Sequence, residues 1–225
     1  MHIAEGILPV EWAAAWFAPA AAVVAKGLKD IKKRSEEIPV SKPFMGILGA
    51  AVFIISLLPI PVPIAGTSSH PTGTPLAAIL IGPFVSTVLA AVALFFQALF
   101  FAHGGLTTLG ANIVSMGVVG SFVGYSIFFL GKRARLPLFW AAALAGVVGD
   151  LAVYLTTSLE LALALHGQQP VLLAMATFFV AYLPTQLPLA FLEGAFTGLA
   201  LRFVAERRPD ILWRLGVVAP EGTKS

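Results

Sequence analysis

Long apolar runs dominate this chain and restrict the folds that it can adopt. One of them, from Leu76 to Phe101, contains no charged residue. A membrane-spanning helix needs about 20 apolar residues, whereas a strand of a membrane barrel needs only about 10 in alternation. Only 11% of the residues are charged and 58% are hydrophobic, while soluble domains carry about 25% charged residues. The chain is therefore expected to be an all-α membrane protein.

Basic residues gather in three places and orient the expected helices. Six of the fourteen lie between Lys26 and Lys42, a second group spans Lys132 to Arg135, and a third lies in the C-terminal tail. Cytoplasmic loops are enriched in Lys and Arg. This rule places the N-terminus outside and the C-terminus in the cytoplasm. The basic residues show no interleaving with aromatic residues, so nucleic-acid binding is not expected.

About seven transmembrane segments satisfy this orientation. Gly82-Pro83 divides the apolar run at 76–101, because proline cannot continue a helix. The expected segments cover residues 10–26, 43–58, 75–82 (a short span or half-helix), 84–102, 106–130, 137–160 and 171–203, the last bent or broken near Pro184 and Pro188. Residues 1–225 then form a single domain, with residues 1–9 and 59–75 outside and 204–225 as a cytoplasmic tail.

The segment from Pro59 to Pro75 is rich in proline, glycine and hydroxyl residues and contains His70. It is either an outer loop or non-helical backbone within the protein. The second arrangement is tolerated only where the backbone lines a cavity or is covered by neighbouring helices.

The N-terminus carries the first candidate for metal chemistry. Because His2 is bulky, Met1 is expected to be retained, so its α-amine, the His2 amide and the His2 imidazole lie within two residues. Together they can form a planar tridentate chelate, and a fourth nitrogen would complete the square plane that suits Ni(II), Cu(II) and some Co(II) sites. His70 is the preferred fourth ligand and His103 the second choice. The alternative is that His2 is an ordinary solvated terminal residue.

Several sequence blocks, in order along the chain, extend this interpretation. They are MHIAEGILP at 1–9, GTSSHPTG at 66–73, Gln97 followed by HGGLTTLGAN at 103–112, TQLPL at 185–189 and EG at 193–194. In these blocks and their spacing the chain resembles the CbiM/NikM family, the substrate-binding membrane components of energy-coupling-factor transporters for cobalt and nickel. The resemblance covers nearly the whole chain and slightly favours the cobalt-type members.

The resemblance implies a role for each matched residue. One Co²⁺ or Ni²⁺ ion would be bound in a plane by the Met1 amine, the His2 amide nitrogen, the His2 imidazole and the His70 imidazole. His103 and Asn112 would belong to the polar surround that orients these ligands. Glu5 and Ser69 are further candidates for that surround. No cofactor beyond the transported ion and no enzymatic activity are expected.

The resemblance also implies partners in the cell (inner) membrane of a prokaryote. They are a transmembrane coupling subunit, cytoplasmic ATPase subunits and, in some members, a small accessory membrane subunit. The chain itself has no phosphate-binding Gly-x-x-x-x-Gly-Lys-Ser/Thr motif, so it has no ATPase site of that kind. Ala14, Ala18 and Ala22 recur every fourth residue, a spacing that lets another helix approach closely. They mark either the docking face for the coupling subunit or a lipid-facing surface.

Two other functions remain as alternatives. An intramembrane metalloprotease would require a His-Glu-x-x-His pattern or a similar helical pair, and the sequence has none. A proton-coupled secondary transporter of a divalent cation would use Asp150 and Glu193, which lie inside apolar segments. Buried acids are costly and usually functional. We expect these two to form hydrogen bonds with Ser, Thr or Gln between helices, with a cation path as the alternative.

Overall fold

The computed structural model describes residues 2–39, 41–57, 59–62 and 66–218. Nearly all of this chain is helical. Four helices are long and apolar enough to cross a membrane: Pro83–Phe101, Leu109–Arg133, Leu138–Leu165 and Val171–Arg207. Ser41–Ser56 is a shorter apolar helix. This establishes a helical, membrane-type fold, while the expected count of seven spans and the orientation of the termini remain predictions.

The helices follow the expected order closely. They are α1 (Val10–Glu37), α2 (Ser41–Ser56), α3 (Thr74–Ile81), α4 (Pro83–Phe101), α5 (Leu109–Asn112), the π-helical segment η1 (Ile113–Val119), α6 (Gly120–Arg133), α7 (Leu138–Leu165), α8 (Val171–Arg207) and α9 (Pro209–Arg214). The division between α3 and α4 lies at Gly82, as expected from Gly82-Pro83. With eight residues, α3 is only about 12 Å long, too short to cross a bilayer core of about 30 Å.

One expected helix end is wrong, and of the two alternatives for the last helix, bent or broken near Pro184 and Pro188, the break is excluded. Helix α1 continues past Lys26 to Glu37, because i,i+4 ion pairs such as Lys26–Asp30 extend it beyond the apolar part. Helix α8 is continuous from Val171 to Arg207 despite two internal prolines. Membrane-type helices tolerate internal proline where neighbouring groups satisfy the freed backbone.

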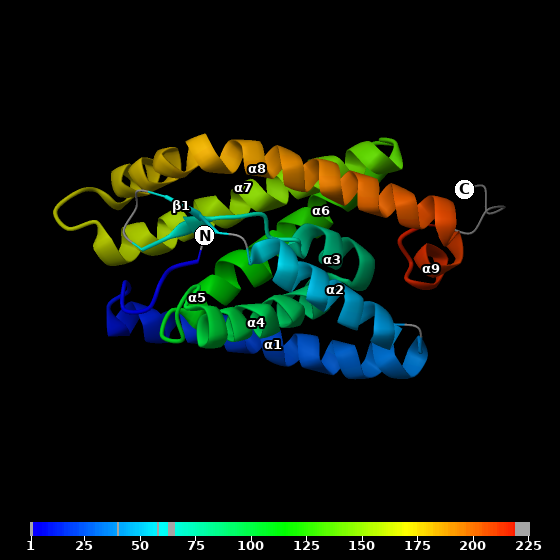
Figure 1. Ribbon diagram of the computed structural model, residues 1–225, viewed down its shortest axis with the longest axis horizontal. Coiled ribbons are helices and arrows are strands. Elements are labelled where there is room, and N and C mark those ends of the chain that lie inside the picture. Colours follow the sequence, from blue (N-terminus) through cyan, green and yellow to red (C-terminus); the bar gives the residue numbers. More distant parts are fainter. Residues whose placement is uncertain (1, 40, 58, 63–65, 219–225) are drawn as a thin grey trace.

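Successive long helices run in opposite directions along the molecule (Figure 1). The end of α1, the start of α2, the turn at 133–138 and helix α9 lie at one end, and the segments at 101–109 and 165–171 lie at the other. The three basic clusters of the sequence therefore share one end, which we call the basic end. The short segments that carry His2 and His103 lie at the opposite end.

A small β-structure connects the N-terminal segment to the loop before α3. Strands β1 (Ile60–Pro61) and β2 (Ser68–Ser69) are antiparallel, with Ile60 opposite Ser69. Ile3 forms an isolated antiparallel bridge with Thr67, and the Ala4 amide donates to the Gly66 carbonyl at 3.0 Å. The polar segment expected either as a loop or as internal backbone is thus partly internal, because His70 and Thr72 are fully buried.

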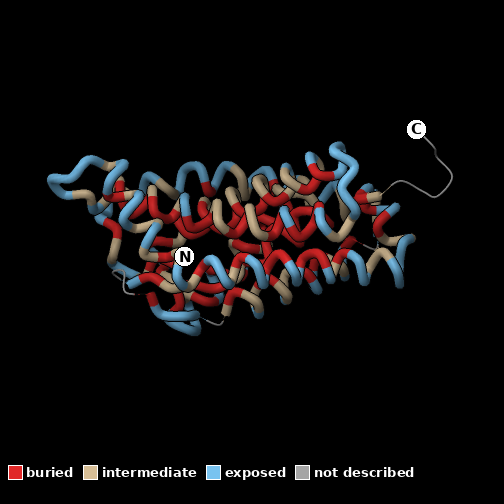
Figure 2. The backbone as a smooth tube through the Cα atoms, turned by 90° about the horizontal axis from the view of Figure 1, so that it is seen from above, coloured by how far each residue is buried: buried red, intermediate tan, exposed pale blue. Residues whose placement is uncertain are grey.

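Close helix packing depends on small residues. All eight residues of α3 are buried. Figure 2 shows that buried residues line the inner sides of the helices. On α7 and α8, a Cβ added to Gly146 would lie 2.8 Å from the Gly194 Cα atom. These two helices therefore touch through their backbones, which fixes the relative height of the polar groups that they carry.

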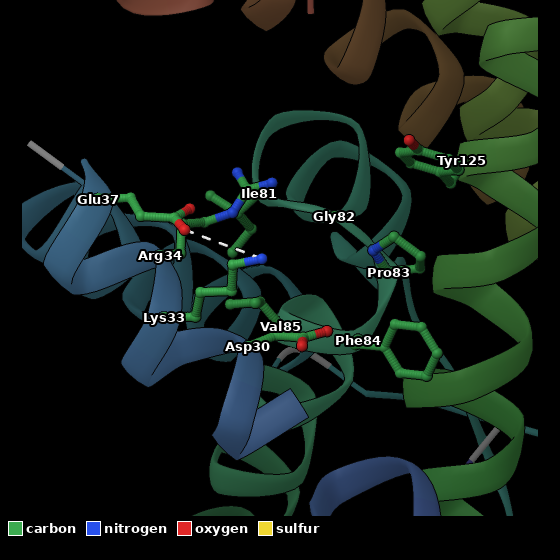
Figure 3. A pocket seen from close by; sticks show the side chains of 10 residues that line it. All are labelled: Asp30, Lys33, Arg34, Glu37, Ile81, Gly82, Pro83, Phe84, Val85 and Tyr125. Carbon is green, nitrogen blue, oxygen red and sulfur yellow. Dashed lines mark ion pairs between the residues drawn. The ribbon is translucent and has the colours of Figure 1, made fainter. Parts of the chain in front are cut away.

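A charged cavity of about 320 Å³ lies near the basic end, far along α3 from His70. Figure 3 shows Asp30, Lys33, Arg34 and Glu37 from α1 on one side and Tyr125 from α6 on the other. Lys33 pairs with Glu37 at 3.8 Å. Both signs of charge are present, so this cavity is not a simple cation or anion site.

Candidate metal centre

Three buried histidines meet at the end of the bundle opposite the basic end. One ring nitrogen from each of His2, His70 and His103 lies within 4.8 Å of the others, and this is the one such group of metal-ligand side chains among the described residues. The His2 ring centroid lies 4.4 Å from that of His70 and 4.0 Å from that of His103. Residues from the N-terminal segment, the loop before α3 and the segment after α4 thus form one cluster.

The hydrogen bonds of His70 set its tautomer. His70 Nδ1–H donates to the Pro71 carbonyl at 2.8 Å, which leaves the lone pair of Nε2 free to bind a metal. That Nε2 atom directly faces His2 Nδ1. Two nitrogen lone pairs that face each other repel unless a proton or a metal ion lies between them. His2 Nδ1 and His70 Nε2 therefore form a natural pair of metal ligands.

Burial keeps the three imidazoles neutral. Loss of hydration lowers the pKa of His2 and of His70 well below the ordinary value of 6.5. It lowers the pKa of His103 to about 4. Metal ions bind the neutral imidazole. At neutral pH all three imidazoles are therefore in the neutral form. No positively charged imidazolium has to lose its extra proton before a metal binds.

His103 has one occupied and one open ring nitrogen. Its Nε2 lies 3.1 Å from the Ser68 hydroxyl, whereas its Nδ1 is buried and has no hydrogen-bond partner. His2 Nε2 is also buried and unpartnered. Unsatisfied nitrogens of this kind are costly in a purely structural cluster. The arrangement allows His103 either to orient the other rings or to approach the ion itself.

The backbone next to His2 is held at several points. The Asn112 side-chain oxygen accepts from the Ile3 amide at 2.8 Å, and its nitrogen donates to the Ile3 carbonyl at 3.1 Å. The Thr108 hydroxyl donates to the same carbonyl at 2.6 Å. These contacts, together with the bridge between Ile3 and Thr67, fix the position of the His2 amide nitrogen.

Glu5 and Ser69, the other residues predicted to surround the metal site, contact the histidine cluster only indirectly. Glu5 is exposed, and its carboxylate accepts from the Thr107 amide at 3.2 Å. Hydrogen bonding from Thr107 lowers the pKa of Glu5. The buried Ser69 hydroxyl lies 2.8 Å from the Thr185 hydroxyl of α8. Neither side chain contacts a histidine ring through a described hydrogen bond, so both act on the backbone segments that carry the cluster.

Asp150 and Glu193, two of the three buried acids of α7 and α8, have hydrogen-bond partners of the expected residue types. Gln186 Nε2 donates to an Asp150 carboxylate oxygen across the α7–α8 contact. Glu193 accepts from the Thr72 hydroxyl at 2.8 Å. The expected bond between helices is confirmed for Asp150 and Gln186, whereas Glu193 bonds to Thr72 in the loop before α3.

The remaining predicted residues lie elsewhere or outside the described part. Met1 precedes the described residues, so its amine stays a prediction. Ala14, Ala18 and Ala22 are exposed on α1, while Ala13, Ala20 and Gly27 face inward. The alanine face is thus free in the structure, as either docking or lipid contact requires.

Tyr154 was not among the residues predicted for the site. Its hydroxyl accepts a hydrogen bond from the His70 amide at 2.9 Å and donates one to the His70 carbonyl at 3.0 Å. Its one sequence signal was its position one helical turn after Asp150. Thr108 was also missed as a contact of Ile3, although it lies in the HGGLTTLGAN block. The partners of both residues are distant in sequence.

Comparison with known proteins gives a consistent result. Residues 2–211 match the family model CbiM, the cobalt uptake substrate-specific transmembrane region. A cobalt transport protein CbiM of Sorangium cellulosum is 53% identical over 97% of both chains. One of Geobacter sulfurreducens is 51% identical over 99% of this chain and 64% of its own length.

Solved structures agree with these sequence matches. A structure described as a transition metal transporter superposes with a TM-score of 0.81 at 31% identity, covering 96% of this chain and 99% of the other. A truncated form gives a TM-score of 0.80 over 92% of this chain. With its apolar helices and prokaryotic relatives named as transport proteins, the chain is a multi-pass membrane protein of a transport family, not an enzyme, and it belongs to the CbiM family.

Proposed function

We propose that this chain is the substrate-capture membrane subunit of an ATP-driven importer of the energy-coupling-factor type for divalent cobalt or nickel. The observation that carries the proposal is the contact between His2 Nδ1 and His70 Nε2. The hydrogen bond from His70 Nδ1 to Pro71 makes this Nε2 the free nitrogen. A borderline metal ion matches such a pair of imidazole nitrogens.

The complete ligand set in this proposal is planar. The Met1 amine and the deprotonated His2 amide join the two imidazole nitrogens, so four nitrogens surround the ion. Asn112 and Thr108 hold Ile3 and thereby support the amide that must lose its proton. His103 lies beside the plane, and its open Nδ1 serves as an orienting or additional contact.

We favour cobalt as the physiological cargo because relatives with 53% and 51% identity are named cobalt transport proteins. The ligand chemistry alone does not discriminate in this direction. Nitrogen ligands bind Ni²⁺ at least as tightly as Co²⁺ in the usual order of metal affinities. We therefore expect the purified protein to bind both ions.

ATP-driven transport needs partners, since the sequence has no phosphate-binding motif of its own. We assign the exposed face of Ala14, Ala18 and Ala22 to the transmembrane coupling subunit, and the ATPase subunits to the cytoplasm at the basic end. A small accessory membrane subunit is a further candidate partner. Seven segments, with the N-terminus outside and residues 204–225 in the cytoplasm, complete the proposed topology.

The runner-up function is a proton-coupled secondary transporter of a divalent cation. Asp150 and Glu193 favour it only as buried acids. Both already accept hydrogen bonds from neighbouring polar groups. This observation supports a structural use of the two acids and makes the ATP-driven function the better proposal.

The site can be tested with purified variants and one matched control. His2→Ala and His70→Ala should each abolish stoichiometric Co²⁺ and Ni²⁺ binding, measured by titration calorimetry and metal analysis. His166→Ala should bind like the wild type, because His166 lies in the turn after α7 and not in the cluster. Full binding in both of the first two variants would refute the site.

A second experiment tests the α-amine of Met1. Residues added before Met1 and not removed by processing should abolish tight binding, because the α-amine is then an amide. A free amine restored by protease cleavage before Met1 should recover it. Tight binding by the extended protein would exclude the amine as a ligand.

A further inference from the structure

The segment that contains His70 is attached by hydrogen bonds to both helices of the α7–α8 hairpin. Tyr154 of α7 uses its hydroxyl both to accept from the His70 amide and to donate to the His70 carbonyl. On α8, Thr185 contacts Ser69 through their hydroxyl groups. The backbone on both sides of the His70 side chain is therefore positioned by residues of the last two long helices.

Glu193 makes the densest of these attachments. One carboxylate oxygen accepts from the Thr72 hydroxyl and the Gly73 amide, each at 2.8 Å, and the other accepts from the Thr72 amide. Three donors from two adjacent residues thus converge on one carboxylate. Hydrogen bonds to a charged acceptor are about twice as strong as neutral ones.

No ion pair explains the burial of this carboxylate, and its ionisable neighbour is the equally buried Asp150 of α7, with which it shares a hydrogen bond. Glu193 is 2% exposed, and the ion pairs among the described residues are formed by other, more exposed side chains. A buried carboxylate is costly unless it is fully hydrogen-bonded. The donors of the segment at 72–73 supply those bonds, so this segment and α8 stabilise each other.

Helix α8 contains a weak point between its two attachments to this segment. Thr185 lies before Pro188 and Glu193 lies after it, and all three belong to one continuous helix. Proline lacks the amide that would bond to the preceding turn, so helices bend at such positions. A bend at Pro188 would move Glu193 relative to Thr185.

We propose that Glu193 is a positioning residue that holds His70 against the bound ion, and that separation of its carboxylate from residues 72–73 opens the site for release. The proposal rests on the proposed function, because it assumes that His70 binds the transported ion. Movement of the basic end of α8, on the far side of Pro188 from the histidine cluster, is transmitted to His70 through Glu193. Glu193 does not touch the ion.

The first test is Glu193→Gln in the full-length purified protein loaded with Ni²⁺. The amide nitrogen of Gln faces a backbone or hydroxyl donor, so at least one contact becomes repulsive. We expect the visible absorption and circular dichroism of bound Ni²⁺ to match those of the wild type, because the ligands are unchanged. The dissociation rate into excess chelator should rise by about 10- to 100-fold, the usual effect of losing an orienting contact.

The matched control is Glu206→Gln. Glu206 lies on the same helix but is exposed and paired with Arg202. This variant should release Ni²⁺ at the wild-type rate. It shows whether removal of a carboxylate from α8 has a general effect.

A second pair of variants approaches the contact from its other side. Thr72→Val removes one of the three donors and should raise the dissociation rate by a smaller factor than Glu193→Gln. Thr72→Ser keeps the hydroxyl and should restore the wild-type rate. If Glu193→Gln does not fold, this pair alone decides the proposal, because a simple packing role of Thr72 would favour Val, which keeps the branched shape.

The outcomes separate this proposal from the function beneath it. Wild-type dissociation rates in both Glu193→Gln and Thr72→Val, with binding lost in His70→Ala, would overturn the positioning role and leave the metal site intact. A changed Ni²⁺ spectrum in Glu193→Gln would make Glu193 a ligand and also overturn the positioning role. Retained binding in His70→Ala would refute the proposed site itself.

Discussion

Asn112 uses both ends of its side-chain amide on the backbone of a single residue, Ile3. The Ile3 amide follows the His2 residue directly, so this clamp holds the backbone on the C-terminal side of His2. Asn112 is 1% exposed and stands where α5 meets the π-helical segment η1. Such π-helical insertions occur frequently at functional sites.

Replacement of Asn112 by Leu should therefore weaken metal binding without removing a ligand. We expect the Kd for Ni²⁺ and Co²⁺ to rise by about 10- to 100-fold, as is usual for residues that orient metal ligands. Asn112→Asp keeps the acceptor for the Ile3 amide and loses the donor, so its effect should be intermediate. Calorimetric titration measures all three proteins, and equal Kd values would show that the clamp does not support the site.

The lowered pKa of His103 predicts that the stability of the metal-free protein depends on pH. Its pKa is about 4 in the folded state and about 6.5 in an unfolded chain. Between these values the unfolded state binds the extra proton, so stability falls as the pH decreases from about 6.5 towards 4. His2 and His70 act in the same direction, because burial lowers the pKa of each.

Thermal unfolding in detergent at pH 8 and pH 5 measures this effect. The Tm of the metal-free wild type should be lower at pH 5. His103→Gln removes one of the three linked groups, so the difference between the two Tm values should shrink. An undiminished difference in this variant would mean that other groups cause the acid sensitivity.

The sequence predicted which site residues lie together wherever the direction of each helical segment was sufficient to place them. His2, His70 and His103 were expected on one side because the basic clusters fix the direction of each segment, and the structure brings them together. The contacts of Tyr154 with His70 and of Glu193 with Thr72 could not be read in this way. They join residues far apart in sequence, and their pairing depends on the height at which α7 and α8 pack.

Helix α1 packs on α4 through Gly27, and this contact gives a prediction about stability. A Cβ at Gly27 would lie 2.3 Å from the Phe84 carbonyl oxygen and 2.5 Å from a Val88 methyl carbon. Gly27→Ala should destabilise the protein by about 1–3 kcal/mol, the usual cost of overpacking. Gly46→Ala on α2 meets no atom within 4 Å and should leave the Tm unchanged or raise it, since Ala favours helix.

The opposite face of α1 gives a prediction about assembly. Ala18 is exposed between Ala14 and Ala22, so a larger side chain there disturbs no internal contact. Ala18→Leu should reduce co-purification with the coupling subunit, because it prevents close approach of another helix. Metal binding by the isolated subunit should stay at the wild-type level. Normal assembly in this variant would favour the lipid-facing interpretation of the alanine face.

Element-level prediction was accurate for helices and poor for irregular backbone. The break at Gly82 was found because Gly-Pro has a local meaning that does not depend on packing. The β1–β2 pair and the bridge between Ile3 and Thr67 were missed, because two-residue strands have no periodic signal. The sequence did not decide between a bent and a broken α8 for a related reason: whether a proline breaks a helix depends on which neighbours satisfy the freed carbonyl.

At the scale of the whole molecule, opposite helix directions separate two functional ends. The histidine cluster lies at one end, and the three basic clusters and the charged cavity of Figure 3 lie at the other. Helix α3, fully buried and only eight residues long, occupies the interior between them. Because α3 stands between the two ends, we expect release of an ion from the histidines towards the basic end to require rearrangement of helices.

Such rearrangement needs an energy source, and this decides between the two proposed transport mechanisms. Proteoliposomes that contain the chain alone should bind Co²⁺ but should not accumulate it, with or without a pH gradient. Vesicles that also contain the coupling subunit and the ATPases should accumulate ⁵⁷Co²⁺ only when ATP is supplied on the ATPase side. In the His70→Ala complex, ATP should drive no uptake, because the ion is not captured. Accumulation by the chain alone under a pH gradient, lost in Asp150→Asn, would instead support proton coupling, because Asp150 is a buried acid with no described hydrogen bond to the loop of His70.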